Sequence, residues 1–227
     1  MKEQQLKIIA RIHTDFPEKF GIPRQSGLVK GLKGKIVFEP EYRNPDAIRG
    51  MEDFSHLWLI WGFSKAVRKE WSATVAPPRL GGRVRMGVFA TRSPYRPNAI
   101  GLSSVRLEAI QLDEKIGPVI TVSGIDMLDG TPIYDIKPYL PYADSHPEAK
   151  GGFGAAVKKH KLHVLFPEDL LKLVEEEERL NIIEILEQDP RTAYIHDDDR
   201  IWGVSYGGYN IRFKVEGQEL TVCEVTQ

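Results

Sequence analysis

The sequence predicts a mainly β protein in which a small β-barrel is followed by a small α+β C-terminal domain. Three observations predict it: short segments with apolar residues at every second position, no convincing amphipathic helix between them, and a change of composition after a linker. A doubly wound βαβ sheet needs helices between its strands, so the first two thirds of the chain favour a barrel with long loops.

The predicted barrel strands are short. Period-two alternation marks Leu6, Ile8, Ala10 and Ile12, then Ile36 and Phe38, then Leu102, Val105 and Leu107, then Ile120 and Val122. Two further runs, Phe54–Phe63 and Met86–Ala90, are apolar almost without interruption, which is typical of strands covered on both faces.

The domain boundaries follow from composition. We expect the barrel over residues 1–145, a linker over 146–163 that mixes Pro, Gly, Ala, Lys and His, and the α+β domain over 164–227. Pro167 and the acids after it predict the start of one broken or two short amphipathic helices. Strands separated by Gly207-Gly208 and Glu216-Gly217 turns are predicted to end the domain.

Composition narrows the class of protein. The chain has 227 residues, of which 41% are hydrophobic, enough for one substantial core and a smaller unit. The longest apolar run, Leu57–Phe63, is about a third of the roughly 20 residues that a membrane span needs, and no signal peptide is visible, so a cytoplasmic protein is predicted. The one cysteine, Cys223, excludes an intrachain disulfide and is expected to be buried.

The charge is unevenly distributed. Residues 1–100 carry 18 Lys and Arg against 9 Asp and Glu, whereas residues 101–227 carry 13 against 23. From Trp71 through Leu107 there is no acid but there are six arginines, whose planar guanidinium groups suit phosphate, carboxylate and base edges. A polyanionic partner and a solvated sheet that pairs with acids elsewhere explain this segment equally well.

A stiff polar loop follows one predicted strand and precedes another. Thr91–Leu102 reads TRSPYRPNAIGL, in which two prolines fix the backbone and display Arg92, Ser93, Arg96 and Asn98. Such a loop on a barrel rim is either a ligand site or a stiff connection.

Other polar residues leave similar alternatives. The acids of Asp126–Asp144 are either ligand-binding carboxylates or the residues of an ordinary Asp-Gly turn. His56 lies in the apolar run FSHLWLIWGF as either a core or a catalytic histidine. No metal site is predicted, because His196 and the acids after it read as an exposed loop.

Five ordered blocks together carry a family resemblance. They are FGIPRQ, GMEDFSHLWLIW, PPRLGG, MGVFATRSPYRPNAIGLS and DMLDGTPIYDIKPYLPYAD, within residues 6–144. In these blocks the chain closely resembles the TsaA-like family, whose characterised bacterial members are tRNA t6A N6-methyltransferases. The tail piece QDPRTAY, Gln188–Tyr194, resembles the family's C-terminal extension, with Thr192 where the family commonly has Pro.

The resemblance implies a β-barrel that binds S-adenosylmethionine without a Rossmann fold, as a homodimer with its site near the subunit interface. It also implies N6-methylation of t6A to m6t6A at the position 3′ of the anticodon, with no metal and no membrane. Carried over by motif, the cofactor pocket is expected to contain Pro23, Arg24, Gln25, His56, Leu57, Arg92, Leu102, Asp126, Met127, Leu128 and Asp129. The proton acceptor is expected to be His56, Asp129 or a substrate carboxylate. A non-catalytic RNA-binding or S-adenosylmethionine-sensing barrel is the alternative, and a metal-free phosphate-ester hydrolase is weaker.

We expect tRNA contacts from the rim and from the C-terminal domain. The expected residues are Arg96, Asn98, Arg191 and Tyr194. Arg191 follows a helix that ends at a proline, which predicts an exposed turn beside an aromatic ring that can stack on an unpaired base. The alternative is that Arg191 only caps that helix.

Overall fold

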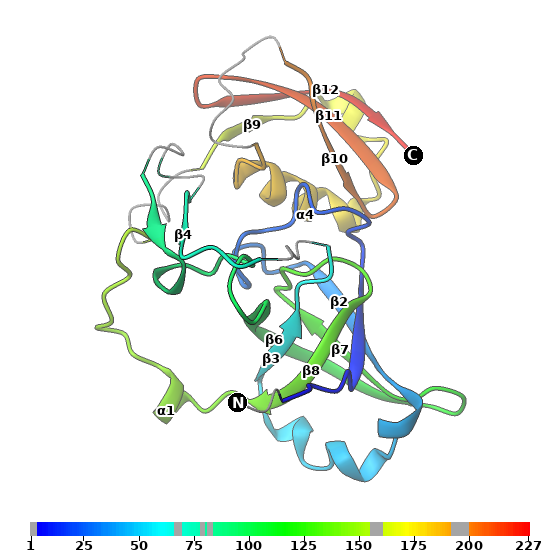
Figure 1. Cartoon of the computed structure of the whole chain (residues 1–227). Helices are drawn as coiled ribbons and strands as arrows, with labels where there is room; N and C mark the ends of the chain where they lie inside the picture. The colour runs from blue at the N-terminus through cyan, green and yellow to red at the C-terminus, as the bar shows by residue number, and fades with distance from the viewer. Residues whose placement is uncertain (1–3, 66–69, 78–79, 81–83, 155–160, 192–199) are drawn as a thin grey trace.

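The computed structural model describes residues 4–65, 70–77, 80, 84–154, 161–191 and 200–227. In these residues the chain forms a closed β-barrel and, above it in Figure 1, a smaller domain in which a sheet covers two helices. Both parts of the predicted fold class, the barrel and the α+β domain, are confirmed.

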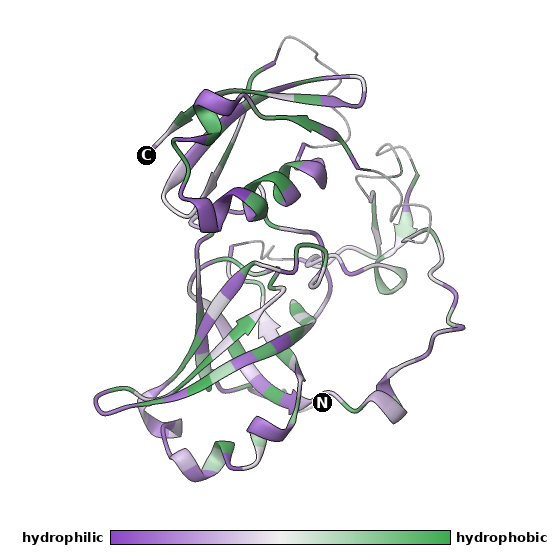
Figure 2. Ribbon diagram, turned by 180° about the vertical axis from the view of Figure 1, so that it is seen from behind, coloured by the Kyte–Doolittle hydropathy of each residue, from purple (hydrophilic) through white to green (hydrophobic). Residues whose placement is uncertain are grey.

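Six antiparallel strands close the barrel in the order β1-β2-β7-β6-β3-β8. They are β1 (Ala10–Thr14), β2 (Lys33–Phe38), β3 (His56–Gly62), β6 (Ile100–Asp113), β7 (Gly117–Ser123) and β8 (Thr131–Pro138). The strands alternate hydrophilic and hydrophobic residues along their length (Figure 2), as a small barrel requires when one face of each strand fills its interior.

The barrel core consists of the inward-facing aliphatic residues. Ile12, Ile36, Leu57, Leu59, Ile120 and Ile133 are fully buried. Burying a side chain of this size stabilises the fold by roughly 1.5–3 kcal/mol, so the six together give the barrel a rigid frame for the loops at its ends.

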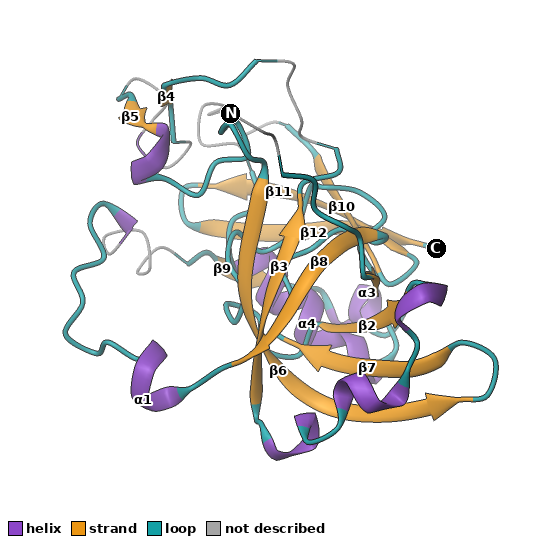
Figure 3. Cartoon of the chain, turned by 60° about the horizontal axis from the view of Figure 1, so that its bottom comes forward, coloured by secondary structure: helices purple, strands orange, loops and turns teal. Residues whose placement is uncertain are grey.

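Short elements occupy the connections between barrel strands. They include the 3-10 helices η1 (Pro40–Tyr42), η2 (Pro45–Ile48), η3 (Met51–Asp53) and η5 (Val88–Ala90). The single helical turn α1 (Pro141–Asp144) follows β8, the last barrel strand. The strands β4 (Thr74–Val75) and β5 (Met86–Gly87) pair as a small separate sheet. Figure 3 shows this pair, with η5 beside it, standing off the barrel.

The C-terminal domain combines a four-stranded sheet with two helices. Its strands lie in the order β10 (Trp202–Tyr206), β11 (Tyr209–Glu216), β12 (Glu219–Thr226) and β9 (His163–Leu165), and its helices are α3 (Glu168–Leu171) and α4 (Glu176–Glu187). The Gly207-Gly208 turn has positive φ at both residues, as the predicted hairpin requires. The last residue of the predicted linker, His163, is the first residue of β9.

Two local predictions are wrong. Met86–Ala90 is not a buried strand, because after two residues of β5 the chain turns into η5 and Phe89 is exposed. Cys223 is exposed rather than buried. Arg212 pairs with Glu224 and Phe213 with Val222, so Cys223 is the extra residue of a β-bulge, and it is exposed between buried Val222 and exposed Glu224.

The segment between β1 and β2 joins the two domains. Phe16 packs against Tyr206 with ring centroids 5.0 Å apart, and Phe20 stacks on Trp202 at 5.9 Å. Gly21, with φ +95°, lies so close to Val204 that an added Cβ would sit 2.7 Å from its Cγ1. The C-terminal domain therefore fixes the course of this segment over the end of the barrel.

No helix in the described part of the chain is long and apolar enough to cross a membrane.

Candidate functional site

A cavity of about 740 Å³ opens at one end of the barrel. It lies where β3 ends, β6 begins and the β7–β8 connection crosses, and the segment after β1 and the loop after η5 complete its wall. Ligand sites commonly occupy about 300–1,000 Å³ at the mouth of such a barrel.

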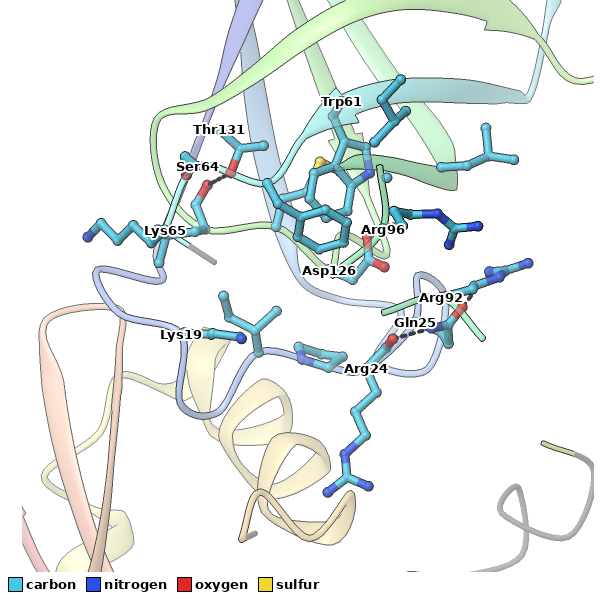
Figure 4. A pocket seen from close by; sticks show the side chains of 18 of the residues that line it. Lys19, Arg24, Gln25, Trp61, Ser64, Lys65, Arg92, Arg96, Asp126 and Thr131 are labelled. Atoms are coloured by element: carbon cyan, nitrogen blue, oxygen red, sulfur yellow. Dashed lines mark hydrogen bonds between the residues drawn. The ribbon is translucent and has the colours of Figure 1, made fainter. Parts of the chain in front are cut away.

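Two aromatic side chains and one buried acid dominate the interior. Trp61 and Phe63 lie with their ring centroids 4.5 Å apart. The Trp61 indole Nε1 donates to Ser103 Oγ at 2.9 Å, and Ser103 Oγ donates in turn to Asp126 Oδ1 at 2.6 Å. This chain of hydrogen bonds orients the Asp126 carboxyl group toward the space between Trp61 and Arg92 (Figure 4).

Burial raises the pKa of Asp126 from its ordinary 3.8 to about 6. The hydrogen bonds from Ser103 and from the Ser26 backbone act in the opposite direction, as does the charge of Arg92. A desolvated carboxylate favours a bound cation or a hydroxyl donor. The geometry thus provides one anionic anchor within the cavity.

Cationic side chains surround that anchor. Arg92 Nη1 donates to Gln25 Oε1, which ties the loop after η5 to the segment after β1. Lys19, Lys65 and Arg96 also line the cavity. The wall is therefore anionic at its centre and cationic around it, an arrangement suited to a ligand that carries both signs of charge.

Most of the predicted cofactor residues meet at this cavity. Those that line it are Pro23, Arg24, Gln25, Arg92, Leu102, Asp126, Met127 and Leu128, together with Arg96 and Asn98 from the predicted RNA contacts. Arg24 contributes its backbone side to the wall, while its guanidinium points away (Figure 4) and donates to the carbonyl oxygens of Asp189 and Arg191 at 3.4 and 3.2 Å.

Three predicted cofactor residues lie elsewhere in the subunit. His56 begins β3, five residues before Trp61, so at about 3.3 Å per residue it lies roughly 17 Å along the strand from the cavity. It is exposed, next to Ser55 Oγ at 2.9 Å and to the Tyr139 ring. Leu57 is fully buried in the barrel core. Asp129 is exposed, and its Oδ1 accepts from the Thr14 backbone N–H and contacts His13 Nδ1.

Of the two RNA contacts predicted in the C-terminal domain, the structure describes Arg191 but not Tyr194. Arg191 is not in an exposed turn: its guanidinium makes two hydrogen bonds to the Asp189 carboxylate, at 2.8 and 3.1 Å, and both side chains are only 15% exposed. Its position favours a structural role at the end of α4. Tyr194 lies outside the described residues, as do His196 and the acids that follow it.

Sequence reasoning missed Trp61 and Ser103. Both belong to apolar or alternating strands, and nothing in their local pattern separates a cavity wall from a core position. Their role depends on the β3–β6 register, which pairs Trp61 with Gly101. In the described part of the chain, no group of three His, Cys, Asp or Glu side chains could hold a metal ion.

The closed antiparallel barrel has a charged and aromatic ligand cavity at one end, and the α+β domain holds one wall of that cavity. The protein therefore belongs to the class of two-domain barrels with a single-ended ligand site. Within this class, the family described as tRNA-methyltransferase O N-terminal domain matches residues 11–145, and its C-terminal domain matches residues 159–227. The chain belongs to the tRNA-methyltransferase O family, whose members are S-adenosylmethionine-dependent tRNA (adenine-N6)-methyltransferases.

Individual relatives agree with this family. The chain is 40% identical over 223 residues to the tRNA (adenine(37)-N6)-methyltransferase of Escherichia coli, covering 95% of this chain and 94% of the relative. It is 36% identical over 145 residues to a Pyrococcus abyssi protein named "Probable S-adenosyl-L-methionine-binding protein", covering 64% of this chain and 73% of the relative. A crystal structure of TrmO from Pseudomonas aeruginosa superposes with a TM-score of 0.78 at 32% identity, covering 100% of this chain and 98% of that one.

Proposed function

We propose that this chain transfers a methyl group from S-adenosylmethionine to N6 of t6A in tRNA, giving m6t6A at the position 3′ of the anticodon. One observation carries the proposal: the buried Asp126 carboxyl group lies between an aromatic wall and Arg92 in the cavity. That cavity belongs to a chain 40% identical to a tRNA (adenine(37)-N6)-methyltransferase.

The chemistry of the cavity wall fits S-adenosylmethionine. An ionised Asp126 can accept from an ammonium group or a ribose hydroxyl, and Arg92 can donate two hydrogen bonds to a carboxylate. The rings of Trp61 and Phe63 offer faces for an adenine and for a cationic sulfonium centre. When bound, S-adenosylmethionine supplies an electrophilic methyl group on sulfur.

The protein's own task is to position the acceptor and to remove a proton. N6 of t6A is a weak nucleophile, because its lone pair is delocalised into the ring and the adjoining carbonyl, so alignment supplies most of the rate enhancement. Arg96 and Asn98 line the cavity, and we propose that they contact the modified base. Among the described lining residues Asp126 is the one acid, and His56 and Asp129 of the same subunit do not line the cavity. We therefore propose the substrate carboxylate, or a residue supplied from outside this wall, as the proton acceptor.

Methyl transfer to bulk tRNA from a strain that lacks the enzyme tests the proposal. The wild-type chain with radiolabelled S-adenosylmethionine is expected to label the tRNA, and nucleoside analysis is expected to find the label in m6t6A. Asp126→Asn is expected to reduce calorimetric S-adenosylmethionine affinity about 10-fold or more, since a charged hydrogen bond in a buried site contributes roughly 1.5–3 kcal/mol.

Asp135→Asn is the matched control, because Asp135 is an acid of β8 that does not line the cavity and pairs with Lys137 in solvent. Cofactor binding without transfer to any tRNA would show a sensor or RNA-binding protein instead. Equal labelling of tRNA that lacks t6A would remove t6A as the substrate.

A further inference from the structure

Two aromatic side chains, Trp71 and Phe89, are exposed beside the cavity and do not belong to the hydrophobic core. Trp71 is 52% exposed and Phe89 is 71% exposed. Their rings are nearly parallel, with an interplanar angle of 24° and centroids 6.3 Å apart. We call Trp71, Phe89 and Arg96 the aromatic platform. Large exposed apolar groups that gather in one place mark binding surfaces more often than scattered ones do.

Arg96 connects the platform to the cavity. Its Cζ lies 5.9 Å from the centroid of the Phe89 ring, and the same residue lines the cavity wall. Arg96 Nη1 donates to the Thr91 carbonyl oxygen at 3.0 Å, which fixes the guanidinium between the two. A ligand portion lying over Phe89 would therefore adjoin whatever the cavity holds.

Backbone and side-chain hydrogen bonds hold the platform in place. Val88 N–H donates to the Ala73 carbonyl oxygen at 3.0 Å, and Ser72 N–H donates to the Tyr95 carbonyl oxygen at 3.1 Å. Arg85 adds two hydrogen bonds to Thr74, both of 2.8 Å, across the β4–β5 pair. The rings thus stand on a braced hairpin, so little conformational entropy is lost when a ligand stacks on them.

The positive charge around the platform favours an anionic ligand. The sequence from Trp71 through Leu107 contains no acid, and the described arginines near the platform, Arg85, Arg92 and Arg96, are all cationic. A second copy docked symmetrically on this face would bring the same cationic patch against it, a like-charge contact that opposes association. An RNA strand brings both an anionic backbone and flat bases, which stack on aromatic rings and guanidinium planes.

We propose that the aromatic platform stacks an unpaired RNA base adjacent to the adenosine that enters the cavity. This inference rests on the proposed tRNA substrate and assigns its neighbouring nucleotide to Trp71, Phe89 and Arg96. The platform reads an exposed base face rather than a base edge, so it holds the loop in register without selecting a particular base.

Binding of a fluorescently labelled anticodon stem-loop RNA, measured by anisotropy at fixed salt, tests the platform. Phe89→Leu keeps an apolar side chain but removes the ring, and is expected to weaken RNA binding roughly 5- to 150-fold, the range for loss of one base–aromatic stack. Phe89→Tyr keeps a ring and is expected to bind within about twofold of wild type. Tyr142→Leu is the matched control, since Tyr142 is 86% exposed on α1 and does not line the cavity.

The outcomes separate this inference from the proposed function. Unchanged RNA affinity in Phe89→Leu, with wild-type methyl transfer to tRNA intact, overturns the platform and leaves the function standing. If the wild type transfers no methyl group, the function fails while the anisotropy comparison still decides the platform. If sedimentation shows that Phe89→Leu converts a dimer to a monomer, and RNA affinity changes only with that conversion, the platform is a contact between copies and the inference is overturned.

Discussion

Asp126 is the cavity residue whose surroundings alter its protonation. It is an acid within a largely apolar wall, with Ser103 on one side and Arg92 nearby, and its pKa is raised to about 6. Near neutral pH it is therefore mostly ionised, yet a fall of one or two pH units neutralises it.

Cofactor affinity is predicted to depend on this titration. If the ionised Asp126 pairs with the cofactor ammonium group, S-adenosylmethionine affinity rises as the pH increases from about 5 to 7 and levels off above that. Calorimetry across this range measures it. Asp126→Asn is expected to bind weakly with no such rise, and an unchanged pH profile in that variant would assign the titration to another group.

The raised pKa of Asp126 also makes the stability of the folded protein depend on pH. The folded protein holds the Asp126 proton to a higher pH than the unfolded chain does, so its stabilising contribution is fully present below about pH 3.8 and is lost as the pH rises through about 6. Without ligand, Asp126→Asn should therefore melt higher than wild type at pH 7.5, by the equivalent of about 2–3 kcal/mol, and near wild type at pH 4.

At the level of elements, the register between β3 and β6 builds the cavity wall. It places Gly101 opposite Trp61, and an added Cβ at Gly101 would lie 2.2 Å from Trp61 Cε2. The indole can lie flat across β6 only because this position has no side chain. Its Nε1 then reaches Ser103 two residues along the same strand.

Gly101→Ala is predicted to displace the Trp61 indole and to break its hydrogen bond to Ser103. Overpacking of this kind costs about 1–3 kcal/mol, and the loss of Ser103 alignment should weaken S-adenosylmethionine binding as well. Thermal melting and calorimetry on one preparation check both effects. Gly87→Ala is the control, because nothing lies within 4 Å of an added Cβ there. Normal cofactor binding by a folded Gly101→Ala protein would contradict this account of the wall.

Elements with strong local signals were predictable, and those that depend on pairing were not. Alternation located β2 and β7, and turn glycines located the C-terminal hairpins, because both signals are local. The prediction of a buried strand at Met86–Ala90 was wrong, because hydrophobicity alone cannot distinguish a buried strand from an exposed apolar segment. Likewise, motif blocks indicated Arg92 and Asp126, but Trp61 and Ser103 needed the β3–β6 register.

At the scale of the whole molecule, His56 lies far from the cavity of its own subunit. It lies at the opposite end of β3 in its own subunit, yet its motif resembles the family's cofactor site. The predicted homodimer, with its site near the subunit interface, would reconcile the two if His56 of the partner subunit reached the cavity.

Mixed dimers test this arrangement. At S-adenosylmethionine concentrations below saturation, we expect Asp126→Asn and His56→Gln each to transfer little methyl alone, and a mixed dimer, isolated by two different tags after co-expression, to recover up to about half of wild-type transfer. Recovery arises because one of its two sites then contains both intact residues. Full activity of His56→Gln alone would exclude a role for His56, and no recovery would place both residues in one subunit's site.

Because β9 pairs with β12, the last strand of the described sheet, the C-terminal sheet can be completed only late in synthesis on the ribosome. β12 emerges last, some 50 residues after β9, whereas all six barrel strands are out by Pro138. The barrel can thus close while the C-terminal sheet still lacks a partner for its first strand. The ring contacts of Phe16 with Tyr206 and of Phe20 with Trp202 can form only after β10 has been synthesised. The cavity wall that these contacts position is therefore completed only late in translation. A nascent chain stalled before β10 would carry a closed barrel with an unfinished ligand cavity.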